Sequence, residues 1–218
     1  MDLKFWHEKW QKKEIGFHQE KINPHLIQFW EMLNIRNGKR VLAPLCGKSL
    51  DMIWLQSQGY RVVGVETSSL AVKAFFHENN LRATHTRKGK LIQWQCGELE
   101  ILLGDFFDLQ ASDIGEVAGV YDRASLIALS GNLRERYVQR MANLLPQGAP
   151  TLLITVEYPE EEMKGPPFAV KWEEIQRLYE PHFKIKKLLE QDTLADSPCF
   201  QERGLTRFME RVALLIRR

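Results

Sequence analysis

The sequence predicts an α/β protein with a mostly parallel sheet covered by helices on both faces. Short β-branched runs alternate with amphipathic segments along the 218 residues. The run 40–45 is followed by a turn that contains Gly47, and the run 61–66 ends in an acid. A glycine turn after one strand and a carboxylate after the next are the layout of a doubly wound nucleoside-binding domain.

The other elements follow from the same alternation, with proline and glycine marking where helices end. We expect helices after Asn23-Pro24, from Ser49, over 70–78, over 134–145 and over 172–179. Seven strands are expected, over residues 40–45, 61–66, 99–105, 117–122, 151–158, 185–190 and 207–215. The last two are spaced like a hairpin, which predicts an antiparallel edge strand on an otherwise parallel sheet.

Size and composition fit one domain over residues 1–218, with residues 1–23 as a lid segment. Hydrophobic side chains make up 44% of the chain, and a net charge of +2 argues against a nucleic-acid groove or a polybasic membrane patch. The apolar runs are too short to span a bilayer, and the start has no secretory signal. Three scattered cysteines indicate reduced thiols and a cytoplasmic protein.

Glu66 points most directly to a ligand. It ends a β-branched run that follows Gly47, at a position where a carboxylate accepts two ribose hydroxyls. No further glycine brings the backbone close to a pyrophosphate, so we expect an adenosine without a diphosphate, and S-adenosylmethionine fits. A solvated loop acid is the alternative for Glu66.

Two further strand ends carry candidate binding residues, namely Asp105 with Phe106, and Arg123. The first pair could hold an adenine between an acid and an apolar ring, or could be a loop acid beside a core phenylalanine. Arg123 follows a strand, where a partly buried guanidinium needs an anionic partner. That partner is either the carboxylate of a cofactor or Asp122.

Aromatic residues are concentrated before the first strand, among lysines and glutamates. Trp6 and Trp10 are one helical turn apart, and Phe17 follows them. They could form a stripe packed on the domain, or a lid that closes aromatic rings over a flat, partly cationic ligand. In the second case a sulfonium near an indole would gain about 0.5–2 kcal/mol of cation–π energy.

Other chemistries can be weighed on the same residues. Gly47-Lys48-Ser49 copies the end of a phosphate-binding P-loop, but the glycine needed five residues earlier is Leu42. A nucleotide kinase or switch is therefore disfavoured, while a non-catalytic sensor of an adenosyl ligand stays open. The six histidines show no metal-ligand spacing, so we expect no metal.

Together these residues resemble the thiopurine S-methyltransferase family over most of the chain. The blocks that carry the resemblance are Trp6-x-x-x-Trp10, Gly16-Phe17-His18-Gln19, Pro44-Leu45-Cys46-Gly47-Lys48-Ser49-x-Asp51-Met52, Val62-Val63-Gly64-Val65-Glu66, Gly104-Asp105-Phe106-Phe107, Asp122-Arg123-Ala124 and Gly165-Pro166-Pro167-Phe168. The resemblance implies the Rossmann-like class I S-adenosylmethionine-dependent methyltransferase fold, and methyl transfer to the sulfur of aromatic or heterocyclic thiols. Transfer to nitrogen, to oxygen or to selenite and tellurite is the alternative within the same fold.

The resemblance also implies roles for particular residues. Cofactor contacts are implied for Trp10, Leu45, Glu66, Arg123 and the Asp105-Phe106 turn, and the lid hypothesis adds Trp6. Phe17 matches an aromatic next to the substrate, and Arg203 is a second substrate candidate. No general base is required, because an aromatic thiol is largely thiolate near neutral pH and in-line positioning supplies the rate. Members without a long N-terminal extension are associated with detoxification of selenium and tellurium compounds, and we expect a monomer.

Overall fold

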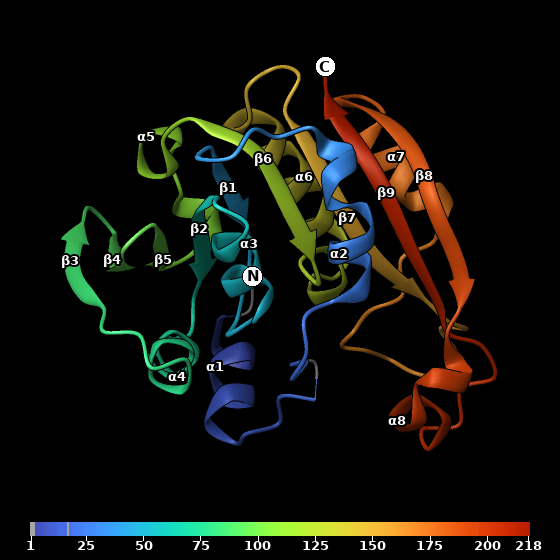
Figure 1. Ribbon diagram of the computed structural model, residues 1–218. Coiled ribbons are helices and arrows are strands. Elements are labelled where there is room, and N and C mark those ends of the chain that lie inside the picture. The colour runs from blue at the N-terminus through green and yellow to red at the C-terminus, as the bar shows by residue number, and fades with distance from the viewer. Residues whose placement is uncertain (1–2, 17) are drawn as a thin grey trace.

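A nine-stranded sheet forms the centre of the computed structural model, which describes residues 3–16 and 18–218. The strand order is β3-β4-β5-β2-β1-β6-β7-β9-β8, and Figure 1 shows helices in front of the sheet and behind it. The strands are β1 (Arg40–Ala43), β2 (Arg61–Glu66), β3 (Thr84–Lys88), β4 (Leu91–Cys96), β5 (Leu99–Leu103), β6 (Val117–Arg123), β7 (Pro150–Glu157), β8 (Phe183–Asp192) and β9 (Met209–Arg217).

Helices alternate with these strands along most of the chain, as the sequence pattern predicts. The α-helices are α1 (Leu3–Gln11), α2 (Pro24–Phe29), α3 (Asp51–Ser57), α4 (Ser69–Glu78), α5 (Ala111–Ile114), α6 (Asn132–Leu144), α7 (Trp172–Tyr179) and α8 (Pro198–Gln201). Four 3₁₀ turns join them, namely η1 (Trp30–Leu33), η2 (Phe106–Asp108), η3 (Leu126–Ala128) and η4 (Leu194–Asp196). The short helices α5 and α8 escaped the sequence pattern because four residues are barely one helical turn.

The five central strands β5, β2, β1, β6 and β7 are parallel. Strand β9 pairs antiparallel with β7 and with β8, so the expected antiparallel pairing at one edge is confirmed. The antiparallel strand β9 itself lies one position in from the edge, between β7 and β8. The mostly parallel α/β architecture is thus as predicted.

The expected number of seven strands is wrong. Residues 84–88 and 91–96 form the hairpin β3–β4, which pairs antiparallel with β5 and extends the sheet at its other edge. The outer strand reads Thr-His-Thr-Arg-Lys, and its first four residues are all exposed. A strand with no buried face has no apolar alternation, and so it gives no signal to a pattern based on hydrophobic periodicity.

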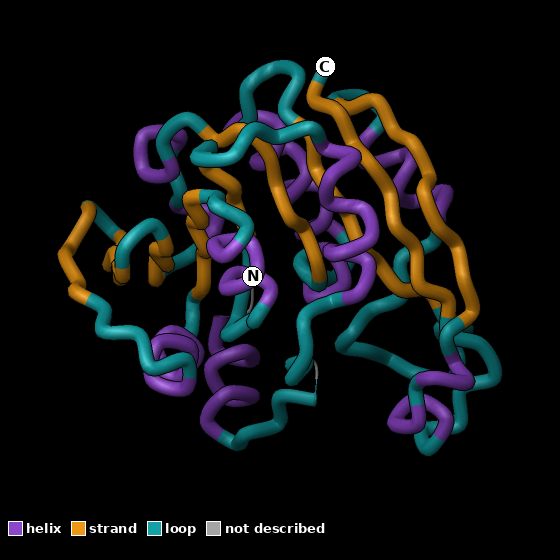
Figure 2. Tube along the Cα trace, viewed as in Figure 1, coloured by secondary structure: helices purple, strands orange, loops and turns teal. Residues whose placement is uncertain are grey.

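Each face of the sheet is covered by its own set of helices, as the purple segments of Figure 2 show. On one face the core contains Tyr137 of α6 and Tyr179 of α7. On the other face it contains Leu26 of α2, Met52 of α3 and Phe75 of α4. Burial on both faces explains why the central strands are nearly continuous apolar runs.

The helix expected after Asn23-Pro24 is present, and only some of its apolar side chains are buried. Leu26 and Trp30 are buried, whereas Ile27 is 52% exposed. Asn23 caps this helix, because its Oδ1 accepts from the backbone N–H of His25 at 2.9 Å. Ile27 lies about 100° around the helix from Leu26, and so it points away from the sheet.

The carboxyl ends of β1, β2 and β6 meet where the strand order reverses. Strand β1 pairs with β2 on one side and with β6 on the other. Ligands bind at such a switch point in open α/β sheets.

Within residues 3–16 and 18–218, no helix is long and apolar enough to cross a membrane.

Candidate active site

A cleft opens at this switch point, over the carboxyl ends of β1, β2 and β6. Its lining combines aromatic rings, apolar side chains, one acid and two cationic side chains. The lining residues are Trp6, Trp10, His18, Ala43, Pro44, Leu45, Cys46, Gly47, Lys48, Ser49, Met52, Glu66, Thr67, Tyr121, Arg123, Ala124, Ile127, Ala128, Pro166 and Pro167. Five of the sequence-predicted site residues, namely Trp6, Trp10, Leu45, Glu66 and Arg123, are therefore brought together.

The turn after β1 presents its backbone to this cleft. Leu45 and Gly47 both have left-handed backbone, with φ of 45° and 55°. The Cys46 N–H donates to the Val65 carbonyl at 3.0 Å and fastens the turn to β2. A Cβ at Gly47 would lie 3.4 Å from the Trp10 ring, so glycine lets the aromatic ring approach the turn closely.

A second strained residue follows β6. Ala124 has a φ of 72°, in a region that alanine rarely adopts. Both loops that frame the cleft thus hold a non-glycine residue in left-handed conformation. Such backbone costs about 1–3 kcal/mol and clusters at binding sites, where the surrounding structure enforces it.

Glu66 is 6% exposed, so it is not the solvated loop acid considered as an alternative. Its Oε2 accepts from the Gly47 N–H at 2.8 Å, and its Oε1 accepts from the Ser68 N–H at 2.6 Å. Burial raises the pKa of this carboxyl above its usual value, while the backbone donors oppose that shift. Each carboxylate oxygen can accept more than one hydrogen bond, and so Glu66 can still accept hydrogen bonds from two hydroxyl groups.

Arg123 also lines the cleft, with its side chain 13% exposed. Its Nη1 lies 3.4 Å from Oδ2 of Asp51. The alternative that Asp122 pairs with Arg123 is wrong. Asp122 is buried and accepts from the Tyr137 hydroxyl at 2.7 Å. Neighbouring residues of a strand point to opposite faces, so Asp122 and Arg123 point apart.

Sequence reasoning missed Asp51 as a site residue. It lies at the start of α3, is 1% exposed and is 72 positions from Arg123 in the chain. Its only sequence signal is its place in the same block as Gly47 and Ser49. An acid at a helix start is also a common stabilising feature, and so this signal is weak.

The N-terminal segment lies against the cleft. Trp10 is 8% exposed, and His7 Nε2 lies 3.0 Å from the Thr67 carbonyl, which joins α1 to the segment before α4. His18 lines the cleft as well, and its pKa is lowered by burial and by the nearby charge of Lys48. Phe17, the predicted substrate neighbour, lies outside the described residues.

The side chains of Asp105 and Phe106 are not among those that line the cleft. Asp105 Oδ1 accepts from the Phe107 N–H at 2.9 Å, and Phe106 is fully buried against Tyr137. This geometry matches a loop acid beside a core phenylalanine. The turn itself stays close to the site, because the Gly104 N–H donates to the Glu66 carbonyl at 2.9 Å. A contact between this turn and the cofactor stays a prediction.

Arg203 lies away from the cleft as well. It is exposed, its guanidinium lies 5.6 Å from the centre of the Phe200 ring, and its Nη1 lies 3.5 Å from the Met163 sulfur. Its proposed contact with substrate stays a prediction.

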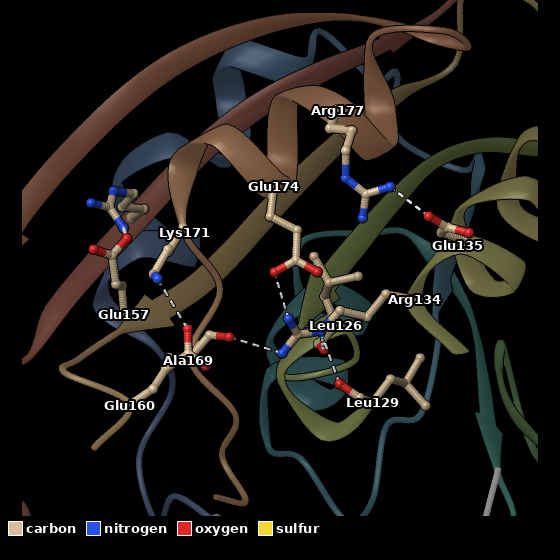
Figure 3. A network of polar contacts seen from close by, with 11 residues as sticks. Leu126, Leu129, Arg134, Glu135, Glu157, Glu160, Ala169, Lys171, Glu174 and Arg177 are labelled. Carbon is tan, nitrogen blue, oxygen red and sulfur yellow. Dashed lines mark hydrogen bonds and ion pairs between the residues drawn. The ribbon is translucent and has the colours of Figure 1, made fainter. Parts of the chain in front are cut away.

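One side of the cleft, here called the outer wall, is formed by Ile127, Ala128, Pro166 and Pro167. Figure 3 shows that Arg134 holds the segments around it. Its Nε donates to the carbonyls of Leu126 and Leu129 at 3.2 and 2.9 Å, and its Nη2 donates to the Ala169 carbonyl at 2.9 Å. Its Nη1 lies 2.6 Å from the carboxylate of Glu174. Arg134 therefore joins the segments on both sides of the outer wall to α7.

Two other chemistries find little support in this geometry. Lys48 Nζ is held by the Glu78 carboxylate at 2.7 and 2.8 Å, which competes with a phosphate for the lysine of a P-loop. In the described part of the chain, no group of three or more His, Cys, Asp or Glu side chains could hold a metal ion.

The switch point beside β1, the glycine turn and the acid at the end of β2 define the fold of a class I S-adenosylmethionine-dependent methyltransferase. Solved structures share it. The crystal structure of an S-adenosylmethionine-dependent methyltransferase from Anabaena variabilis matches with a TM-score of 0.67 at 16% identity, covering 99% of this chain and 95% of that one. A 1,6-didemethyltoxoflavin-N1-methyltransferase from Burkholderia thailandensis matches with a TM-score of 0.64 at 14% identity, covering 97% and 86%.

Sequence similarity identifies the family within this class. The family model described as Thiopurine S-methyltransferase matches residues 1–218. The thiopurine S-methyltransferase of Nitrosospira multiformis is 46% identical, covering all of this chain and 99% of that protein. That of Methylococcus capsulatus is 44% identical, covering 97% and 96%. The chain belongs to the thiopurine S-methyltransferase family, and the resemblance seen in its motifs is confirmed.

Proposed function

We propose that this protein transfers a methyl group from S-adenosylmethionine to the sulfur of an aromatic or heterocyclic thiol. The observation that carries the proposal is the pairing, in one aromatic cleft, of a buried acid with a partly satisfied guanidinium. Glu66 lies at the end of β2 and Arg123 at the end of β6, and both line this cleft. Family membership supports the same activity.

The residues present fit S-adenosylmethionine as co-substrate. Glu66 can accept the ribose hydroxyls, because its two oxygens together offer about four lone-pair sites and the backbone donors of Gly47, Thr67 and Ser68 do not occupy all of them. Arg123 supplies a fixed positive charge for the amino-acid carboxylate. Trp6 and Trp10 offer aromatic surface suited to a sulfonium.

The bound co-substrate supplies a methyl group already activated by its sulfonium. The protein has to hold the acceptor sulfur in line with that methyl, at about 3–3.5 Å. No side chain is assigned as general base, because an aromatic thiol is already largely thiolate near neutral pH. Exclusion of water by the N-terminal segment would strengthen the electrostatic contacts of the thiolate.

Finer assignments belong to the same proposal. Residues 1–23 act as a lid on a single domain of residues 1–218, Phe17 and Arg203 contact the thiol, and the Asp105-Phe106 turn lies beside the adenine. We further propose a cytoplasmic monomer that detoxifies thiols or selenium and tellurium compounds, with neither nucleic acid nor membrane as partner. The three free cysteines fit a reducing compartment.

Calorimetry with S-adenosylhomocysteine and with ATP, followed by a methyl-release assay, tests the proposal. We expect S-adenosylhomocysteine to bind and ATP not to bind, and we expect methyl transfer to a panel of aromatic thiols. Binding without transfer to any thiol or chalcogen oxyanion would favour the non-catalytic sensor. Binding of ATP alone would refute the assignment.

A further inference from the structure

Asp51 is the buried acid that links the cleft to the N-terminal part of the chain. It is the first residue of α3 and is 1% exposed. Its Oδ1 accepts from the Asn23 N–H at 2.8 Å, and its Oδ2 accepts from the Tyr121 hydroxyl at 2.8 Å. The same Oδ2 lies 3.4 Å from Nη1 of Arg123. One carboxylate therefore joins α3, β6 and the residue that caps α2.

These contacts keep Asp51 as a hydrogen-bond acceptor. The pKa of Tyr121 is raised well above its usual value by burial and by the charge of Asp51, so its hydroxyl stays protonated and donates. A buried carboxylate is tolerated when it is paired and hydrogen-bonded. Three donors meet that requirement, two from β6 and one from the residue that caps α2.

Arg123 is held at one end only. Its contact with Asp51 is the one hydrogen bond or ion pair that its side chain makes within residues 3–16 and 18–218. A guanidinium has five N–H donors in a planar fork. Anchoring Nη1 on a buried acid therefore limits rotation of the group and leaves its other donors for a ligand in the cleft.

We propose that Asp51 is a positioning residue that acts through Arg123. It fixes the guanidinium so that its remaining donors meet the carboxylate of S-adenosylmethionine, and the role rests on the function proposed above. The same carboxylate holds the backbone of Asn23, the last residue of the N-terminal segment 1–23. Asp51 thereby sets the position of the cationic group relative to the base of the lid.

A second buried ion pair on the same sheet provides a matched control. Glu100 of β5 is 5% exposed and pairs with Arg40 of β1. Arg40 also donates to the Ile114 carbonyl at 3.1 Å, and neither residue of the pair lines the cleft. Removing the Glu100 charge thus breaks a comparable ion pair without changing the site.

The first test compares Asp51→Asn with Glu100→Gln. An asparagine can still accept from Asn23, but its neutral amide no longer attracts Arg123. We expect Asp51→Asn to raise the KM for S-adenosylmethionine and the Kd for S-adenosylhomocysteine roughly tenfold or more, with the KM of the thiol nearly unchanged. Glu100→Gln should leave all three constants within about twofold of wild type, since a group outside the site makes no differential contact.

A double-mutant cycle separates positioning from a general structural role. If Asp51 acts through Arg123, adding Asp51→Asn to Arg123→Met should cause no further loss of cofactor affinity. Additive losses, or equal losses for both substrates, would overturn the proposal. Should Asp51→Asn not fold, Asp51→Glu keeps the charge but moves it, and it should raise the same cofactor constants while leaving the thiol constant unchanged.

Binding of S-adenosylhomocysteine to the wild-type protein tests the proposed function separately from the role of Asp51. A wild type that binds no S-adenosylhomocysteine would overturn the proposed function and the role of Asp51 together. A wild type that binds it, combined with an Asp51→Asn variant that binds equally well, would overturn the role of Asp51 alone.

Discussion

Arg134 behind the outer wall and Arg123 at the end of β6 are both largely buried, with side chains 6% and 13% exposed. Arg134 donates to three backbone carbonyls and to a carboxylate, all within 3.2 Å. Arg123 has one partner, at 3.4 Å, among residues 3–16 and 18–218. A guanidinium whose three nitrogens are all hydrogen-bonded to protein groups stabilises the fold, whereas one with free donors facing a cleft is available to a ligand.

The largest effect that this comparison predicts is on stability. Arg134→Met should lower the free energy of unfolding by about 3–5 kcal/mol, because it leaves Glu174 and several buried carbonyls without their donor. Urea denaturation measures this change. Arg177→Met on α7 is the control, since its exposed pair with Glu135 should be worth about 1 kcal/mol or less. Equal losses for both variants would contradict the structural role of Arg134.

Asp122, which precedes Arg123 in the chain, should make the stability of the fold depend on pH. Burial raises the pKa of Asp122 from 3.8 to about 6, although the Tyr137 hydroxyl opposes the shift. Between about pH 4 and pH 6 the folded state therefore retains a proton that the unfolded state has lost, and stability falls as pH rises. The loss levels off above pH 7 at about 3 kcal/mol, following the cited shift.

Asp122→Asn removes this titration and can still accept from Tyr137. The variant should gain stability relative to wild type as pH rises from 4 to 7, measured by urea unfolding at each pH. A stability difference that is the same at pH 4 and pH 7 would show that Asp122 does not carry the effect.

Glu66, like Arg123, is expected to affect ligand binding more than stability. Glu66→Gln should weaken S-adenosylhomocysteine binding by about 1–3 kcal/mol, the typical cost of losing a charge-assisted hydrogen bond. Calorimetry measures the affinity, and a thermal melt checks the fold. An unchanged dissociation constant in a folded variant would remove Glu66 from the ribose site.

Arg123→Lys keeps the charge but loses the planar fork. We expect it to weaken the binding free energy of the cofactor by about 1–2 kcal/mol, while the thiol KM stays nearly constant. The melting temperature should change little, in contrast to Arg134→Met. A shift confined to the thiol constants would place Arg123 at the substrate, and a large loss of melting temperature would make it a structural residue.

The smallest effect concerns the N-terminal segment. If residues 5–20 close over the cofactor, their amide hydrogen exchange should slow when S-adenosylhomocysteine is added. The burial of Trp10 and the contact of His7 with Thr67 already join α1 to the domain. Equal exchange with and without ligand would favour a permanently packed aromatic stripe.

The sequence predicted those features that arise within short segments. The strand 61–66 and its terminal acid are found as expected, and the helix expected over 70–78 is found as α4 (Ser69–Glu78). Helix α7 has the bounds predicted, 172–179. Periodicity and capping are local properties, and so a single sequence reveals them.

Features that depend on distant segments were not predicted. The pairing of Arg123 with Asp51 joins residues 72 positions apart. Phe106 looks the same in sequence whether its ring enters the core or the cleft, and only packing decides between these. The hydrogen bonds of Arg134 depend on the backbone carbonyls of Leu126, Leu129 and Ala169, which carry no sequence signal.

The two edge strands have a consequence for behaviour at high concentration. Strand β3 exposes His85 and Arg87, and strand β8 exposes Lys184, Lys186 and Lys187. The outer side of an edge strand has unpaired backbone groups that can recruit another chain, and charged side chains oppose that recruitment. The hairpin that adds β3 thus ends the sheet in a polar strand that resists aggregation.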